Sequence, residues 1–179
     1  GHYLTGADVP ANASVHGMVI FHFACYGGGT PDYDQFFHQA NQTPPMIADT
    51  PFVAALPKAW LTHPRGGALA CIGHVERAWG YSIVAPEAGQ QIQPFQNAIG
   101  MILTGHPLGY ALKDFNERYA SLSTGLATMM KKSQISKKLD NEAYVTTWVQ
   151  RNDAEGYILL GDPAVRLRVD DLSVSTNTG

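Results

Sequence analysis

The chain has 179 residues, a length that suits a single domain with a sizeable core. Hydrophobic residues make up 45% and charged residues 15%, which is an ordinary globular balance. The formal net charge of −3 excludes a strongly basic protein, so neither nucleic acid nor a membrane is an expected partner. No apolar run is long enough to span a bilayer.

The first predicted strand covers residues 18–24, a mostly apolar run that ends at glycines. Such a run is typical of a strand buried on both faces of a parallel sheet. Cys25 follows it directly, before a turn at Gly27, Gly28 and Gly29. Reactive groups in open α/β sheets lie just beyond the carboxyl ends of the strands, so Cys25 is a candidate nucleophile. The glycines permit close approach of a substrate and can direct N–H groups toward an oxyanion. The alternative is a buried structural cysteine.

A crossover unit is predicted next. Helices are expected over residues 32–41 and from Thr50 onward, because Thr50 and Pro51 form a helix start signal. Pro57 should kink the second helix. An apolar strand over residues 68–72 follows, and strands separated by this length and pattern are typically parallel and adjacent.

The segment after the second strand, residues 74–81 (HVERAWGY), leaves the predicted sheet at the same end as the candidate nucleophile. Loops at that end of a sheet usually build the binding site. We therefore expect Trp79 and Glu76 to line a substrate pocket together with Gly27 and Gly28. The alternative is an ordinary surface loop with Trp79 folded into the core.

The second half of the chain is predicted to be mainly helical. Apolar spacing indicates helices over residues 94–103, 108–129 and 140–152. A short strand is expected over residues 157–160, and residues 164–169 are expected to form a final strand-like tail. No internal repeat or domain boundary is visible, so residues 1–179 are interpreted as one domain.

The two cysteines, Cys25 and Cys71, both lie in apolar, strand-like surroundings. A disulfide framework is therefore not expected, and a reducing compartment such as the cytoplasm is favoured. No group of histidines and cysteines has zinc spacing, so neither a metal nor a cofactor is predicted. The sequence begins with Gly1, and we expect it to be a processed product or a piece of a longer polypeptide.

Three segments, in this order, resemble the catalytic domain of the gingipain and caspase-like cysteine peptidases, including the related CHAT domains. They are residues 20–25 (IFHFAC) with the glycine turn, residues 66–73 (GGALACIG) followed by 79–81 (WGY), and residues 157–163 (YILLGDP). The likeness is closest to gingipain-like and CHAT-like bacterial proteins. It implies an α/β fold, a caspase-like (flavodoxin-like) three-layer sandwich whose mainly parallel sheet is flanked by helices.

The resemblance also implies a cysteine endopeptidase that acts on a peptide or protein through a Cys–His dyad. In that mechanism the thiolate attacks the scissile carbonyl, the imidazole protonates the leaving amine, and a covalent acyl-enzyme is hydrolysed. By position, Cys25 is the nucleophile and Cys71 belongs to the core. Trp79 matches an aromatic residue in the loop that walls the primary specificity pocket.

The dyad histidine is not identified by position. In the family it lies in a His-Gly motif at the end of the preceding strand. His16 precedes a glycine, but an extended strand of about nine residues would hold it about 30 Å from the thiol. His22 is interpreted as a core histidine. His74 and His2 are the candidates within the chain, and our first expectation is that an upstream segment or chain supplies the imidazole.

Two other interpretations remain open. The first is a catalytically inactive caspase-fold module that binds or regulates another protein. The second is a flavodoxin-like nucleotide binder, which the glycine turn disfavours because it matches neither a P-loop nor GxGxxG. Substrate specificity is also open: Glu76, Asp32 and Asp34 can favour a basic side chain before the scissile bond, or can simply face water.

Overall fold

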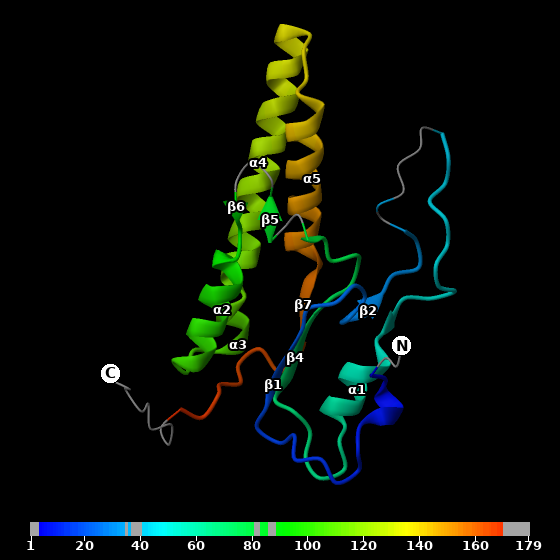
Figure 1. The fold of residues 1–179 in the computed structure, drawn as a ribbon, viewed down its shortest axis with the longest axis vertical. Helices are drawn as coiled ribbons and strands as arrows, with labels where there is room; N and C mark the ends of the chain where they lie inside the picture. Colours follow the sequence, from blue (N-terminus) through cyan, green and yellow to red (C-terminus); the bar gives the residue numbers. More distant parts are fainter. Residues whose placement is uncertain (1–3, 35, 37–40, 81–82, 86–88, 170–179) are drawn as a thin grey trace.

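In the computed structural model, residues 4–34, 36, 41–80, 83–85 and 89–169 are described. Their centre is a three-stranded sheet in the order β1-β4-β7 (Figure 1). β1 (Val19–His22) pairs in parallel with β4 (Ala70–His74), which confirms the predicted neighbours. β4 pairs antiparallel with β7 (Tyr157–Gly161). The fold is therefore α/β with a small mixed sheet flanked by helices, and the expectation of a mainly parallel sheet was wrong.

The direction of β7 follows from the path of the chain before it. The long helices α4 (Lys113–Ser136) and α5 (Asn141–Gly156) pack side by side as an extended pair (Figure 1). α5 returns the chain to the carboxyl end of β4, where Tyr157 pairs with His74. A strand that starts where its neighbour ends must run antiparallel to it.

The crossover between β1 and β4 contains a two-stranded ladder and one short helix. β2 (Gly29–Thr30) pairs antiparallel with β3 (Phe52–Val53), and α1 (Ala55–Leu61) follows. The helix therefore starts later than the Thr50 signal predicted, because the residues after that signal extend the ladder. Pro57 lies in the first turn of α1, where N–H groups have no intrahelical partner, so it does not kink the helix as expected.

The helix expected over residues 32–41 does not start where it was predicted. Tyr33 forms an isolated antiparallel bridge with Met46. The Asp34 carboxylate accepts a hydrogen bond from the Phe36 N–H (3.0 Å), a local turn that competes with helix. Residues 35 and 37–40, which belong to the same prediction, lie outside the described residues.

The second half contains the expected helices with two changes. The apolar stretch predicted as one helix turns at Leu112, which separates α3 (Leu108–Ala111) from α4. Residues 164–169 form no strand; the Val165 carbonyl instead accepts the N–H of Leu108 (3.0 Å), so this tail packs on α3. The remaining elements are η1 (Gly6–Asp8), β5 (Val84–Ala85), β6 (Gly89–Gln90) and α2 (Gln93–Leu103).

Each face of the sheet packs against helices. Side chains alternate along β4, so Ala70 and Ile72 face α2, α3 and α4, whereas the Cys71 thiol faces Pro57 of α1. The core cluster on the first face comprises Ala70, Ile72, Ala98, Ile102, Leu108, Ala111, Leu112, Phe115 and Tyr157. This packing fixes the carboxyl ends of β1 and β4 at one end of the sheet.

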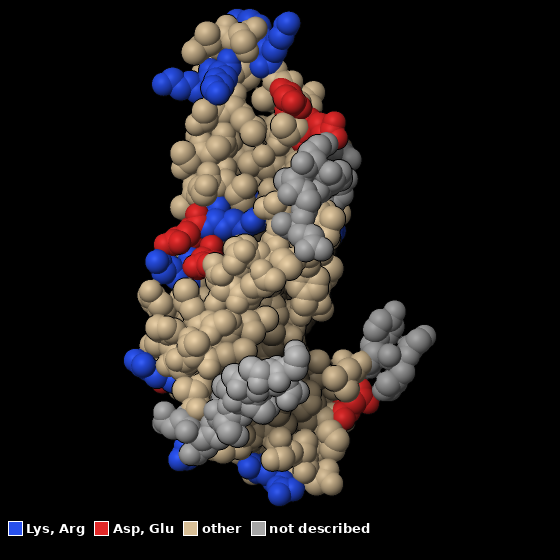
Figure 2. Space-filling view, turned by 60° about the vertical axis from the view of Figure 1, so that its left-hand side comes forward, with Lys and Arg blue, Asp and Glu red and all other residues tan. Residues whose placement is uncertain are grey.

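The far tip of the α4–α5 pair is basic. Lys131, Lys132, Lys137 and Lys138 are all exposed, and Figure 2 shows positive charge gathered at this end, away from the sheet. In the described part of the chain, no helix is both long and apolar enough to cross a membrane.

Candidate active site

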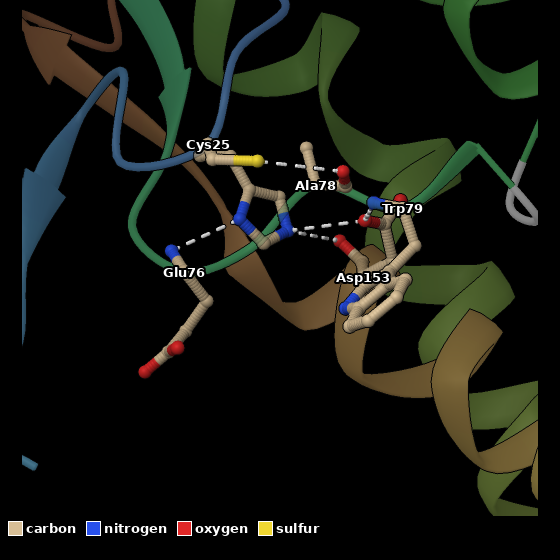
Figure 3. A network of polar contacts seen from close by, with 6 residues as sticks. Cys25, Glu76, Ala78, Trp79 and Asp153 are labelled. Carbon is tan, nitrogen blue, oxygen red and sulfur yellow. Dashed lines mark hydrogen bonds and ion pairs between the residues drawn. The ribbon is translucent and has the colours of Figure 1, made fainter. Parts of the chain in front are cut away.

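Cys25 lies three residues beyond the end of β1, at the end of the sheet where β1 and β4 have their carboxyl ends. Its side chain is exposed and its thiol is free. The thiol donates to the carbonyl oxygen of Ala78 at 3.6 Å, so the loop after β4 passes directly beside it (Figure 3). The predicted proximity of Cys25 to this loop is therefore confirmed.

The residue after the thiol has an unusual backbone conformation. Tyr26 has φ of 56°, in the left-handed region that bulky side chains rarely adopt. Its N–H donates to the carbonyl oxygen of Glu76 at 2.8 Å, which anchors the turn to the loop after β4. Sparsely populated conformations persist where surrounding contacts over-determine them, and they are frequent at functional sites. The sharp turn presents the Cys25 side chain away from the sheet.

Gly27 and Gly28 allow this turn to pack against β4, but their N–H groups are already occupied. The Gly27 N–H donates to Ala24 (3.1 Å) and the Gly28 N–H donates to His74 (2.8 Å). A Cβ on Gly73 would lie 2.7 Å from the Gly28 nitrogen, so two backbones meet here without side chains between them. In this conformation the glycines serve close packing, and the expectation that they direct N–H groups at an oxyanion is not supported.

His74 is held inside the protein with both ring nitrogens engaged. It is fully buried, and its Nδ1 accepts the Glu76 N–H at 3.0 Å. The ring proton therefore lies on Nε2, which is 3.1 Å from the Asp153 carbonyl oxygen and 3.4 Å from the Asp153 carboxylate. Neither nitrogen is available to exchange a proton with Cys25, so His74 does not fit the dyad role considered for it.

Asp153 is a residue that the sequence did not single out. It lies near the end of α5 and is 1% exposed. Its Oδ1 accepts the Trp79 N–H at 2.9 Å while the same residue contacts His74, so one aspartate ties α5 to both ends of the loop (Figure 3). The residue lies in a polar helical stretch with no motif, so only the packing of α5 against β4 reveals it.

Trp79 lies at the surface beside this loop rather than in the core. It is 37% exposed, and its ring contacts Phe36 at a centroid distance of 5.6 Å. Its main chain is fixed by Asp153, whereas its indole remains partly free to contact another molecule. This placement suits a wall of a substrate site next to the thiol.

A family model described as peptidase family C25 matches residues 12–168, which is most of the chain. The chain belongs to this gingipain family of cysteine peptidases. No curated protein and no solved structure matches the sequence. The family match confirms the gingipain part of the resemblance, whereas the kinship with CHAT domains and caspases stays a prediction.

Besides His74, the structure describes four histidines of this C25 family member, namely His16, His22, His63 and His106. His22 Nδ1 is 3.2 Å from the Gly27 carbonyl oxygen. His63 Nε2 is 3.0 Å from the Pro10 carbonyl oxygen. Among the described residues no imidazole hydrogen-bonds to Cys25. His2 lies outside them, so its candidacy stays a prediction.

Glu76 belongs to a different part of the C25 domain from the one expected. Its main chain supports the Cys25 turn, but its carboxylate points away from the thiol (Figure 3). The side chain instead lines a cavity against α5.

Within the described residues no three His, Cys, Asp or Glu side chains are grouped closely enough to hold a metal ion.

Proposed function

We propose that the protein is a cysteine endopeptidase, or the cysteine-bearing part of one, with Cys25 as its nucleophile. The observation that carries this proposal is the position of the thiol. It is free and exposed, directly precedes Tyr26, the strained residue of the turn after β1, and lies beside the loop that carries the partly exposed Trp79. Membership of a cysteine peptidase family makes peptide bonds the expected substrate.

The proposed reaction forms and breaks one thioester. The Cys25 thiolate attacks the carbonyl carbon of the scissile peptide bond, and the tetrahedral intermediate collapses as an imidazolium donates its proton to the leaving amine. Water then gives a proton to the imidazole and attacks the thioester, which releases the carboxylic acid and restores the thiol. In the described residues the Cys25 N–H has no acceptor, which leaves it free to stabilise the oxyanion.

We further propose that a segment upstream of the described residues, or a second chain, supplies the imidazole. β1 is an edge strand of the described sheet, because its only neighbour there is β4. Its free edge offers N–H and C=O groups that can pair with another strand. A parallel strand added there and ending in a histidine would bring the imidazole beside Cys25. Such an addition would also extend the sheet toward the caspase-like sandwich.

An inactive caspase-fold module is the second candidate. The observation that favours it is that no described imidazole reaches Cys25. The two candidates differ in whether the thiol is ever activated, so they can be separated directly. Both free cysteines suit a reducing compartment, and we propose the cytoplasm for either candidate.

The test is cleavage of a mixed peptide library by the polypeptide that includes the upstream segment, with products identified by mass spectrometry. We expect cleavage that disappears in Cys25→Ala, by a factor of about 10³ or more, and persists in the matched control Cys71→Ala. No cleavage by the longer polypeptide would support the inactive module. Equal cleavage by Cys25→Ala would refute Cys25 as the nucleophile.

A further inference from the structure

A cavity of about 420 Å³ lies between the segment after β4 and the last turns of α5. Its lining includes Phe36, Val75, Glu76, Trp148, Arg151 and Glu155. Neither Cys25 nor Trp79 lines it. The cavity is therefore a separate feature from the thiol site, although both are built on the same loop.

Glu76 is the unusual residue of this cavity. It is 8% exposed, and neither of its buried carboxylate oxygens has a hydrogen-bond partner among the described residues. A buried carboxylate without a partner is costly, and such groups are normally paired or hydrogen-bonded. Burial, followed by the nearby Asp34 carboxylate, raises the pKa of Glu76. At neutral pH the Glu76 carboxylate therefore makes the folded protein less stable than a neutral side chain at this position would.

The other charges around Glu76 are matched. Arg151 pairs with Glu155 at 3.1 Å within α5. Arg77 pairs with Asp34 and also attracts the Glu76 carboxylate, but burial outweighs that attraction, so the pKa of Glu76 is raised. Among the charged side chains that line the cavity, Arg151 and Glu155 pair with each other, whereas Glu76 has no ion pair, so a positively charged ligand would complement it.

The walls of the cavity indicate what kind of cation fits. The Phe36 and Trp148 rings meet edge to face, with centroids 5.4 Å apart. Aromatic faces attract organic cations and accommodate an alkyl stem. A metal ion would need several oxygen or nitrogen ligands, and the described residues offer no such group. One carboxylate with aromatic walls therefore favours an organic cation.

We propose that this cavity binds an organic cation, an alkylammonium or a guanidinium, whose charge pairs with Glu76 and whose stem lies against Trp148 and Phe36. The cation can be a free amine or a basic side chain of a bound peptide. The site does not require an active Cys25, so this proposal stands or falls separately from the peptidase proposal.

The first measurement is binding to the folded chain by calorimetry, with n-butylammonium and N-acetyl-lysine methylamide as probes and N-acetyl-norleucine methylamide as the neutral control. We expect the cations to bind and the neutral amide not to bind. Glu76→Gln should weaken binding about tenfold or more, because it removes a charge-assisted hydrogen bond. The matched control, Glu142→Gln, changes an exposed carboxylate at the start of α5 and should bind as the wild type does.

The two probes distinguish the sources of the cation. Equal affinity would identify a free amine as sufficient, whereas a clear preference for the lysine amide would identify a peptide side chain. The proposal is overturned if neither cation binds at about 10 mM, a concentration that detects even weak complexes. It is also overturned if the norleucine amide binds as well as the lysine amide, or if Glu76→Gln leaves the affinity unchanged.

The second measurement is thermal stability, which shows whether Glu76 is retained at a cost. The folded-state pKa of Glu76 is raised, so its contribution to stability is lost as pH rises above the ordinary value of the carboxyl group. The groups that act on it are Asp34, Arg77 and Tyr26, with Arg151 and Glu155 facing the same cavity from α5. Glu76→Gln should therefore melt higher than the wild type at pH 7, with the gap closing near pH 4. A lower melting temperature at pH 7 would show that Glu76 has a structural partner and would contradict the proposal.

Discussion

The two cysteines lie on neighbouring strands, yet their surroundings are opposite. Cys71 is in the middle of β4, opposite Ile20 of β1, and is 1% exposed. Its Sγ faces the Pro57 carbonyl at 4.0 Å, and burial raises the pKa of its thiol to about 11. Cys25 lies beyond the end of β1, exposed, in a turn that bends away from the sheet. The same residue type is core in one place and a candidate nucleophile in the other.

Position relative to the strand end decides whether a thiol is shielded or can react. Inside the strand, pairing on both sides and α1 on one face shield Cys71 from water and from reactants. Three residues beyond a strand end, the backbone is free to turn and the side chain reaches solvent.

Alkylation of the native protein should separate the two thiols most strongly. With a pKa of about 11, roughly one Cys71 side chain in several thousand is thiolate at pH 7.5, and that thiolate is also shielded. We expect iodoacetamide to modify Cys25 at least about 100-fold faster than Cys71, as measured by peptide mass spectrometry. In urea-unfolded protein the two rates should converge. Comparable rates in the native state would mean that Cys71 is accessible and that the contrast fails.

Gly73→Ala should disrupt the packing of the turn after Cys25 against β4. The new Cβ would lie 2.7 Å from the Gly28 nitrogen and 2.9 Å from the Gly27 carbonyl carbon, and backbone atoms of a fixed turn cannot move aside easily. We expect a loss of about 1–3 kcal/mol in the free energy of unfolding by urea, with altered Cys25 reactivity.

The control for Gly73→Ala is Gly125→Ala on α4, where an added Cβ meets nothing within 4 Å. That change should stabilise the protein by about 0.5–1 kcal/mol, because alanine favours helix over glycine. If Gly73→Ala were as stable as the wild type, the tight packing of the Cys25 turn on β4 would be refuted.

Removing each thiol should have a small and unequal effect on stability. Cys71→Ala should cost about 1 kcal/mol as a small core truncation, whereas Cys25→Ala should stay within about 0.5 kcal/mol of the wild type. Because the folded-state pKa of Cys71 is raised, stability should fall by about 1 kcal/mol between pH 8 and pH 10. Urea unfolding at the two pH values checks this, and the Cys71→Ala protein should lack that share of the decline. If the stability of Cys71→Ala falls equally between pH 8 and pH 10, groups other than the Cys71 thiol cause the decline.

Local sequence patterns predicted the parallel pairing of β1 with β4 and the position of Cys25 beside the following loop. They also predicted α5, whose start is capped by the Asp140 carboxylate on the Ala143 N–H at 3.0 Å. The predictions used apolar runs, the helical spacing of apolar residues and a glycine turn, which are all local in the chain.

The features that the sequence did not predict depend on how distant segments meet. The direction of β7 is set by the return of α5, and the burial of Asp153 is set by the packing of α5 on β4. The engagement of His74 by two backbone groups and the turn of Glu76 toward α5 have the same origin. The His74–Asp153 contact joins residues 79 positions apart in the sequence. The residues of the loop after β4 therefore carry no signal of where α5 will lie.

Covalent trapping of the nucleophile tests directly whether Cys25 is the reactive thiol. A panel of peptidyl acyloxymethyl ketones, which alkylate activated cysteines of peptidases, should be reacted with the full-length natural polypeptide that carries this sequence. Our account predicts that one member of the panel modifies Cys25 stoichiometrically, identified by mass spectrometry, and that unfolding the protein first abolishes the reaction. Modification of Cys71, or the absence of modification by any member of the panel, would contradict the account.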